Sequence, residues 1–493
     1  YCLISGCFEA GKSGVAGVFA RNTVSPENVL LAGELGMTIR TFFDAAATQA
    51  SDAPAQRFFQ DGQWTTRSYR ALRERVVRAA SLIQQLGIEP GCQQVALMLE
   101  NSPEWQEIYL ALACAGVAVV PLDPKLREQE ITHILADSES VAIFAGAKLR
   151  ETVLRAAGNL SDMRAFVWVG AADAEAADGA DGRTQCVYDA CTAQAEAASL
   201  RAAEAWLAVH VPQPDDIASI IYTSGTTGKP KGAMLTHANF TSNVAATVER
   251  VGFYPTDNFL NVLPLFHAFS FTANFMLPLG VRGCCSFVRS VRTIAEDMAV
   301  LQPTVLLAVP LMAEKLYARI AEKLKKSLLA RGLLGIGLKR VVSKKVIESF
   351  GGRLRLLGIG GAPTSLAVLK GFQEVGIPVL EGYGLTECAP GVAYPRLDAY
   401  VPGTVGPVLD NMQYKVVDTD AAGAGELCVK GPNVMKGYYK NPAATDEVFD
   451  SDGFFHTGDL VRLDSQKNVT ICGRKKALIV NREGKNIYPE EIE

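Results

Sequence analysis

A loop of glycine, hydroxyl and lysine side chains follows an apolar strand near the middle of the chain. Its residues are, in order, Ile220-Ile221-Tyr222-Thr223-Ser224-Gly225-Thr226-Thr227-Gly228-Lys229-Pro230-Lys231-Gly232. Glycines let backbone N–H groups turn toward an anion, hydroxyls donate further hydrogen bonds, and lysines add positive charge. The composition predicts a polyphosphate site, with a surface linker as the alternative. The loop is not a Walker A motif, because Pro230 stands where that motif has its second glycine.

Two more segments carry side chains that suit a nucleotide. Tyr383, Thr386 and Glu387 offer an aromatic face, a hydroxyl and a carboxylate, which suit a base, a phosphate and a hard cation such as Mg²⁺. Asp459 follows a glycine in a turn, where its carboxylate can accept hydrogen bonds from both hydroxyls of a ribose. Taken singly, the first segment is equally explained as a strand-end turn, and Asp459 as a helix cap or loop stabiliser.

His267 lies in an apolar and aromatic stretch between Leu263 and Phe271. Such surroundings suit a pocket for an apolar carboxylic acid, which needs a few polar groups in an otherwise apolar lining. The alternative is a core histidine that hydrogen-bonds to the backbone. The other four histidines have no chemical partner that the sequence identifies.

The elements that must position these residues follow an alternating pattern. An apolar strand at 95–99, a helix opened by Ser102-Pro103 and a strand at 117–120 predict parallel strands covered by helices. The pattern returns at 216–251 and 354–380, which predicts an α/β fold with two doubly wound subdomains. Thr236 is expected to cap a helix whose apolar residues recur at helical spacing, namely Phe240, Val244, Val248 and Val251.

The remaining segments differ in composition and in the length of their apolar runs. From about residue 402 to 472 the strands are short and broken by glycine, aspartate and asparagine, which predicts a small antiparallel barrel. Residues 171–205 are rich in alanine and acidic groups and predict surface helix or loop. Residues 1–36 show no clear pattern before Met37, so we expect an N-terminal extension there and the start of the folded domain at Met37.

Whole-chain properties exclude several classes of protein. At 493 residues, the chain is too long for one hydrophobic core. Its net charge of −4 gives no overall field that would attract nucleic acid. The eleven cysteines lack the paired spacing of a zinc site and favour a reduced, cytoplasmic setting. We find neither a signal peptide nor an apolar run long enough to span a bilayer.

Taken together, these motifs resemble the ANL superfamily of adenylate-forming enzymes over residues 38–493. The resemblance implies that the loop holds the β- and γ-phosphates of ATP, that Tyr383 lies against adenine and that Thr386 contacts the α-phosphate. It assigns the ribose to Asp459 and Arg474, and the acyl carboxylate to His267. The implied nucleotide-binding residues are Thr223, Ser224, Gly225, Thr226, Thr227, Gly228, Lys231, Gly361, Ala362, Pro363, Gly382, Tyr383, Gly384, Thr386, Asp459 and Arg474. Mg²⁺ is assigned to Thr226 and Glu387, and catalysis to these two with Lys231 and His267.

The resemblance also implies a reaction. A fatty acid would be activated with ATP to acyl-AMP, with release of pyrophosphate, and then transferred to CoA. Residues 386–390 and 484–489 are most similar to bacterial medium- and long-chain fatty acyl-CoA synthetases. Two alternatives stay open: transfer to acyl carrier protein in place of CoA, and a non-catalytic protein that binds acyl groups or nucleotides.

Two further expectations concern the C-terminal end of the chain and a basic stretch within it. The family's hinge falls at residues 473–476, where Gly473 replaces the usual acid or lysine, and the chain ends at Glu493, before the C-terminal domain with its catalytic lysine. We therefore expect residues 473–493 to be the hinge and the start of a truncated C-terminal domain. The basic stretch from Lys315 to Lys345 is interspersed with apolar residues. It could contact anionic lipid at the inner face of a membrane, but a charge-rich helix is usually just a solvated face.

Overall fold

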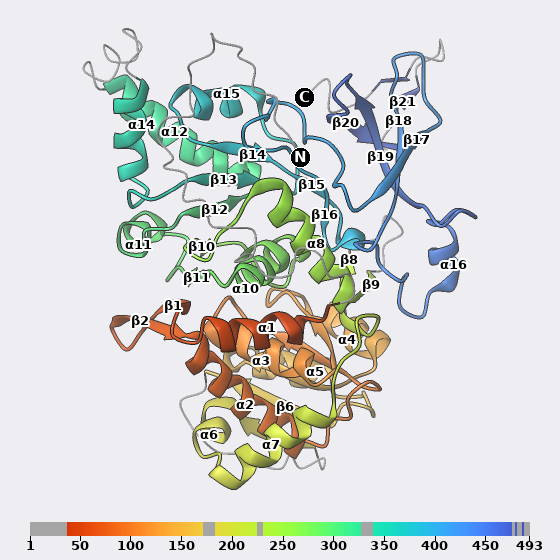
Figure 1. Cartoon of the computed structure of the whole chain (residues 1–493). Helices are drawn as coiled ribbons and strands as arrows, with labels where there is room; N and C mark the ends of the chain where they lie inside the picture. The colour runs from red at the N-terminus through yellow and green to blue at the C-terminus, as the bar shows by residue number, and fades with distance from the viewer. Residues whose placement is uncertain are drawn as a thin grey trace, which may run out of the picture.

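The computed structural model describes residues 37–170, 183–223, 230–326 and 339–475, with the backbone of two short strands at 479–480 and 486–487. Two seven-stranded sheets form the two large halves of the molecule, and a four-stranded antiparallel sheet lies beside the second half (Figure 1). Helices cover the large sheets, as the alternating sequence pattern predicts. The predicted α/β fold with two doubly wound subdomains is therefore confirmed.

The first sheet has the strand order β7-β6-β5-β3-β4-β8-β9. Its neighbours pair in parallel except β8 and β9, which are antiparallel. The strands are β3 (Gln94–Met98), β4 (Ala118–Pro121), β5 (Ser140–Gly146), β6 (Ala165–Val169), β7 (Thr184–Val187), β8 (Ile217–Thr223) and β9 (Lys231–Thr236). The helices of this half are α1 (Ile39–Gln49), α2 (Tyr69–Gln85), α3 (Pro103–Cys114), α4 (Glu128–Ser138), α5 (Arg150–Ala156), α6 (Tyr188–Ala193) and α7 (Ala197–Val209).

Alternate residues of these strands pack on opposite faces of the first sheet. Val95 and Leu97 of β3 belong to the core shared with α2 and α3. Ala96 and Met98 belong to the core shared with α4 and α5. Because side chains alternate along a strand, continuous apolar runs are expected where helices cover both faces. The run at residues 95–99 is such a strand, as the sequence predicts.

The second sheet has the order β14-β13-β12-β10-β11-β1-β2, in which only β1 and β2 pair antiparallel. Its strands are β1 (Pro54–Gln60), β2 (Gln63–Ser68), β10 (Asn258–Asn261), β11 (Cys284–Phe287), β12 (Val305–Ala308), β13 (Leu356–Ile359) and β14 (Val379–Glu381). Its helices are α8 (His237–Val251), α9 (Ala268–Ser270), η3 (Phe271–Met276), α10 (Leu277–Val281), α11 (Ile294–Leu301), α12 (Pro310–Lys326), α14 (Lys339–Glu348) and α15 (Leu366–Glu374).

The antiparallel sheet has the order β17-β18-β19-β20, with β17 (Gln413–Val417), β18 (Gly425–Lys430), β19 (Phe455–Leu463) and β20 (Val469–Arg474). The prediction of short antiparallel strands after residue 402 is confirmed. The described strands do not close into a barrel, however, because β17 and β20 remain at the two edges, and four strands are few to close a barrel around a core. Helix α16 (Pro442–Asp446) connects β18 to β19.

Helix starts agree with the sequence prediction, whereas two strands were missed. The hydroxyl of Ser102 accepts a hydrogen bond from Trp105 N (3.3 Å), and that of Thr236 accepts one from Asn239 N (3.1 Å).

The segment between the loop and α8 is not simply loop but strand β9, a hairpin partner of β8. Strand β7 likewise lies inside residues 171–205, where we expected none. Both are short edge strands whose pairing depends on a neighbour rather than on their own apolar pattern.

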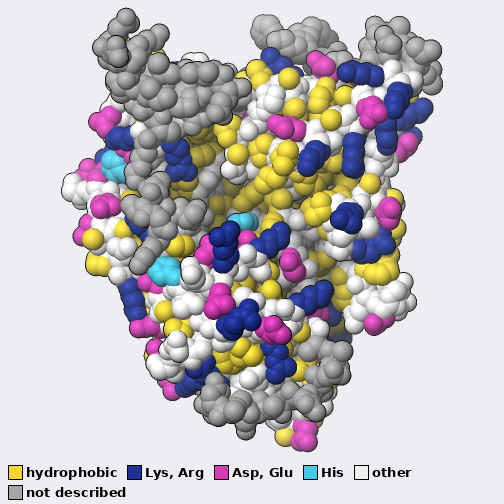
Figure 2. Space-filling view, turned by 180° about the vertical axis from the view of Figure 1, so that it is seen from behind, with side chains coloured by type: hydrophobic (Ala, Val, Ile, Leu, Met, Phe, Trp, Pro, Cys, Tyr) yellow, Lys and Arg dark blue, Asp and Glu magenta, His cyan; other side chains and the backbone are white. Residues whose placement is uncertain are grey.

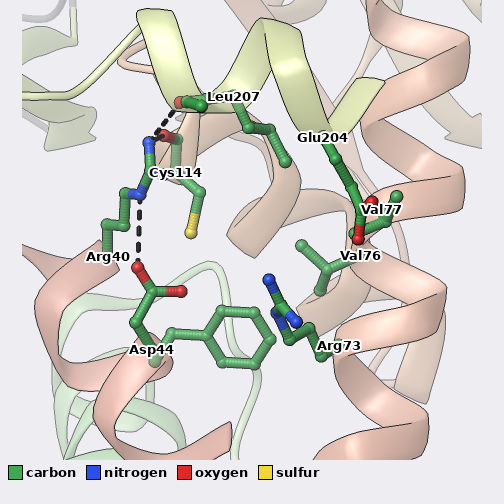
Figure 3. A pocket seen from close by; sticks show the side chains of 10 residues that line it. Arg40, Asp44, Arg73, Val76, Val77, Cys114, Glu204 and Leu207 are labelled. Atoms are coloured by element: carbon green, nitrogen blue, oxygen red, sulfur yellow. Dashed lines mark hydrogen bonds and ion pairs between the residues drawn. The ribbon is translucent and has the colours of Figure 1, made fainter. Parts of the chain in front are cut away.

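A cavity of about 140 Å³ lies among the helices of the first half (Figure 3). The guanidinium of Arg40 borders it and donates from Nη1 to the carbonyl oxygens of Leu207 (2.5 Å), His210 (3.2 Å) and Cys114 (3.3 Å). Arg40 thus ties α1 to the ends of α3 and α7. None of the predicted site residues borders this cavity, so we assign it to the packing of the helices.

The basic stretch is partly described. Lys315, Arg319, Lys323 and Lys326 are exposed on α12, while residues 327–338 lie outside the described part of the chain. Seen from behind, Lys and Arg side chains gather at the upper edge of the molecule on the side of α12 and α14 (Figure 2). Within the described residues, no helix has the length and apolar character that a bilayer span requires. Membrane contact stays a prediction.

Candidate active site

Two parallel strands end side by side at the predicted adenine site. Strand β13 pairs with β14, and Ile359 lies opposite Glu381. Gly361-Ala362-Pro363 follow β13, and Gly382 follows β14, so both segments leave the sheet at its carboxyl edge, the usual ligand-binding edge of such sheets. Gly382 N donates to Ile359 O (2.8 Å), which holds the two segments together. The exposed position of residues 361–363 leaves one side open to a ligand.

Close packing explains the glycines around Tyr383. A Cβ at Gly382 would lie 2.6 Å from the ring of Tyr394, and one at Gly384 would lie 2.1 Å from the carbonyl oxygen of Pro390. Neither position has room for a larger residue. The two-residue strand β15 (Tyr383–Gly384) pairs with β16 (Gly391–Ala393), so the tyrosine is held by a short hairpin.

Tyr383, Asp459 and Arg474 converge from three separate segments. The hydroxyl of Tyr383 donates to Oδ2 of Asp459 (2.5 Å), and Nε of Arg474 donates to Oδ1 (2.8 Å). Asp459 and Arg474 are register partners on β19 and β20. Burial raises the pKa of Asp459, although the hydrogen bond from Tyr383 and the charge of Arg474 lower it. Each carboxylate oxygen keeps a second lone pair, so the pair of oxygens can still accept from two hydroxyls.

Lys231 and Glu387 both contact Tyr438, one at its ring and the other at its hydroxyl. The ammonium of Lys231 is 5.2 Å from the centre of the Tyr438 ring, and the hydroxyl of Tyr438 donates to Oε1 of Glu387 (2.8 Å). Glu387 and Thr386 form the 3-10 turn η4 (Thr386–Cys388) and are half-buried. The other oxygen of Glu387 accepts no hydrogen bond from a described residue. A carboxylate oxygen without a partner is a ligand that Mg²⁺ accepts, so the residues present fit this cation.

Tyr438 was missed by the sequence analysis. It reaches the site because residues 436–439 pair with β9: Tyr439 N donates to Gly232 O (2.7 Å), and Lys436 N donates to Met234 O (3.0 Å). This contact joins segments about 200 residues apart, so no local spacing signals it. The only hint in the sequence is an aromatic pair directly after Gly437.

The phosphate loop itself is described only at its two ends. Thr223 ends β8 and Lys231 begins β9, and the two are register partners. The hydroxyl of Thr223 donates to Lys231 O (3.5 Å). The predicted residues Ser224, Gly225, Thr226, Thr227 and Gly228 lie outside the described residues. The hairpin nevertheless places Lys231, where the loop ends, next to Tyr438, whose hydroxyl donates to Glu387.

His267 precedes α9 and is exposed, not part of the core. The core alternative is therefore wrong. Its ring lies 4.4 Å from that of Phe266, and desolvation by neighbouring groups lowers its pKa although the charge of Asp123 opposes this. The same segment approaches the adenine site, because a Cβ at Gly360 would lie 3.2 Å from the ring of Phe269. No described contact joins His267 to the other predicted residues.

Comparison with known proteins identifies the family of the chain. The profile of the family described as AMP-binding enzyme matches residues 42–439. Long-chain-fatty-acid–CoA ligase 1 of Homo sapiens is 31% identical over 455 residues, which are 86% of this chain and 65% of that protein. Long-chain-fatty-acid–CoA ligase FadD15 of Mycobacterium bovis is 30% identical over 464 residues, 88% of this chain and 73% of that protein. The chain thus spans 65% of the length of the first of these relatives.

Solved structures share the fold. ATP-bound MatB from Rhodopseudomonas palustris has a TM-score of 0.73 and 29% identity, with 93% of this chain and 82% of that chain covered. O-succinylbenzoate coenzyme A synthetase (MenE) from Bacillus subtilis, in complex with AMP, has a TM-score of 0.70 at 23% identity, with coverage of 93% and 82%, and supports the fold alone. The resemblance to the ANL superfamily is confirmed, and the chain belongs to the family of AMP-binding enzymes.

Proposed function

We propose that the protein activates a fatty acid with ATP to acyl-AMP and pyrophosphate, and then transfers the acyl group to CoA. The observation that supports this most is the pairing of two groups, Tyr383–Asp459–Arg474 and Lys231–Tyr438–Glu387, which lie close enough that the charge of Glu387 acts on Asp459. The first group suits an adenosine and the second suits a polyphosphate with its cation. The names of the curated relatives favour long-chain acids as substrates.

In the first step, an oxygen of the fatty-acid carboxylate attacks the α-phosphorus of ATP. A bond forms between that oxygen and phosphorus, the bond to the β-phosphate breaks, and pyrophosphate leaves. In this proposal, Asp459 holds the ribose, Tyr383 lies against the base and Thr386 donates to the α-phosphate. Lys231 balances charge that develops on the phosphate oxygens, which is a large contribution in a desolvated site. Mg²⁺ held by Glu387 and Thr226 would neutralise further phosphate charge.

In the second step, the thiolate of CoA attacks the acyl carbonyl carbon, and AMP leaves. A free carboxylate resists this attack because oxide is a poor leaving group, whereas AMP leaves readily. No enzyme nucleophile is needed, because positioning of the two substrates supplies much of the rate. His267 is proposed to lie near the acyl carboxylate, since its side chain is exposed and Phe269, two residues further on, reaches Gly360.

Substrate and acceptor are tested together by AMP release from the full-length protein. We expect AMP release that requires ATP, CoA and acid, with octanoate and palmitate active and acetate and benzoate inactive or weak. Activity confined to acetate or benzoate would contradict the fatty-acid assignment. AMP release that free CoA does not stimulate, but that holo acyl carrier protein does, would contradict CoA as acceptor.

A further inference from the structure

A carboxylate, a thiol and an imidazole meet on one face of the antiparallel sheet. Glu426 and Cys428 are two residues apart on β18, and Cys428 is the register partner of His456 on β19. Residues two apart on a strand point to the same face. Glu426 and Cys428 are buried, whereas His456 is half-buried, so the cluster is accessible through the histidine.

Two of the three distances between ligand atoms in this cluster match those of a tetrahedral metal site. Sγ of Cys428 lies 3.4 Å from Nδ1 of His456, and that nitrogen lies 3.2 Å from Oε2 of Glu426. All three ligand atoms lie within 4.8 Å of one another. Zinc bonds of about 2.0–2.1 Å to nitrogen or oxygen and about 2.3 Å to sulfur give ligand–ligand distances of about 3.3–3.6 Å at tetrahedral angles. The two shortest distances need almost no adjustment to accept the ion.

The surroundings of His456 fit the same role. With Nδ1 directed at the cluster, Nε2 faces Oδ2 of Asp450 at 3.8 Å. Lys415 holds that carboxylate at 2.7 Å. Metal-bound histidines usually donate their second N–H to a carboxylate, which orients the ring and makes the ligating nitrogen more basic. Asp450 is placed to do this.

A lysine side chain now supplies the positive charge in the cluster. Nζ of Lys475 lies 2.8 Å from Oε2 of Glu426 and 3.1 Å from Oδ2 of Asp418. A cation bound to Glu426 would meet this ammonium at the same oxygen, so the two must compete. Lys475 can leave Glu426 and keep its bond to Asp418. Because Lys475 lies in the predicted hinge at 473–476, the exchange would change how the hinge is tied to the sheet.

We propose that Glu426, Cys428 and His456 bind a divalent cation of the zinc class and that it displaces Lys475 from Glu426. Binding removes the thiol proton of Cys428 to solvent and leaves the sulfur as a thiolate ligand. Water takes the fourth position, as in zinc sites with three protein ligands. A thiolate and an imidazole favour such borderline cations over Mg²⁺. The site is therefore distinct from the Mg²⁺ position proposed at Glu387.

Cobalt substitution tests this site without relying on catalytic activity. We expect Co²⁺ added to the reduced full-length protein to give a tetrahedral visible spectrum and a thiolate-to-cobalt absorption in the near ultraviolet. Both should disappear on addition of Zn²⁺. The Cys428→Ser and His456→Gln variants should lose the signal, whereas Cys472→Ser, a buried thiol on neighbouring β20, should keep it.

Two further variants separate a metal site from a cluster of ion pairs. Asp450→Asn should weaken Co²⁺ binding about 10- to 100-fold. Lys475→Met should strengthen it by roughly fivefold, because a competing charge is removed. No thiolate band in the wild type, or an equal band in Cys428→Ser, would overturn the proposal. Weaker Co²⁺ binding in Lys475→Met would refute the competition. If Cys428→Ser does not fold, His456→Gln and Lys475→Met still decide the question.

Discussion

Replacing Glu387 by glutamine is expected to lower the rate of acyl-adenylate formation by about 100- to 1,000-fold without unfolding the protein. A metal ion contributes several kcal/mol to transition-state stabilisation, and each 1.36 kcal/mol is a factor of ten in rate. The amide oxygen of glutamine can still accept from the hydroxyl of Tyr438, so the local packing should persist. Single-turnover measurement of acyl-AMP at saturating ATP checks this expectation.

Two variants serve as comparisons for Glu387→Gln. Glu296→Gln removes an exposed carboxylate on α11 that pairs with Arg289, and its rate should equal that of the wild type. Tyr438→Phe removes the hydroxyl bonded to Glu387 but keeps the ring beside Lys231. We expect only about a tenfold loss of rate, which corresponds to the free energy of one ordinary hydrogen bond. A Glu387→Gln enzyme within twofold of the wild type would contradict the role assigned to this carboxylate.

Replacing Glu107 by glutamine is expected to destabilise the first half of the molecule by about 3–5 kcal/mol, the usual cost of breaking a buried ion pair. Its fully buried carboxylate accepts from Arg67, from Nε of Arg75 (2.9 Å) and from the hydroxyl of Tyr188 (3.1 Å). Glutamine leaves two guanidinium groups without their counter-charge. Native-state hydrogen exchange should show the loss as a lower opening free energy of the α3 amides.

Glu128→Gln is the matched comparison for Glu107→Gln. Glu128 lies on α4 in the same half and pairs with Arg155 at 3.0 Å, but both side chains are about half exposed. Exposed pairs contribute about 0–1 kcal/mol, so little change is expected. Equal losses of stability in the two variants would show that burial does not determine how much the Glu107 ion pairs stabilise the protein.

The fold was predictable where each element carries its own signal. The strand at 95–99, the Ser102-Pro103 helix start and the Thr236 cap depend on residues within one element and are confirmed. Strands β7 and β9 were missed because their pairing comes from neighbours already in the sheet. The barrel was predicted from short strands and turns, but these cannot show whether the outer strands meet.

The site was predictable as a set of motifs but not as a network. Tyr383, Asp459 and Arg474 were each singled out, and the structure joins them through one carboxylate. Tyr438 was not singled out, because it reaches Glu387 only through the pairing between β9 and a segment about 200 residues away. Residue types reveal which chemistry is available, whereas long-range pairing determines which side chains touch.

The most direct test of the account is ATP–pyrophosphate exchange by the full-length protein, measured with labelled pyrophosphate and without CoA. If the protein forms acyl-AMP reversibly, label should enter ATP only when a fatty acid such as palmitate is present. Binding of ATP and palmitate should be confirmed separately by calorimetry. Exchange that depends on palmitate is the predicted result. Absence of exchange with every acid tested, although ATP and palmitate both bind, would contradict adenylation and leave a protein that binds these ligands without converting them.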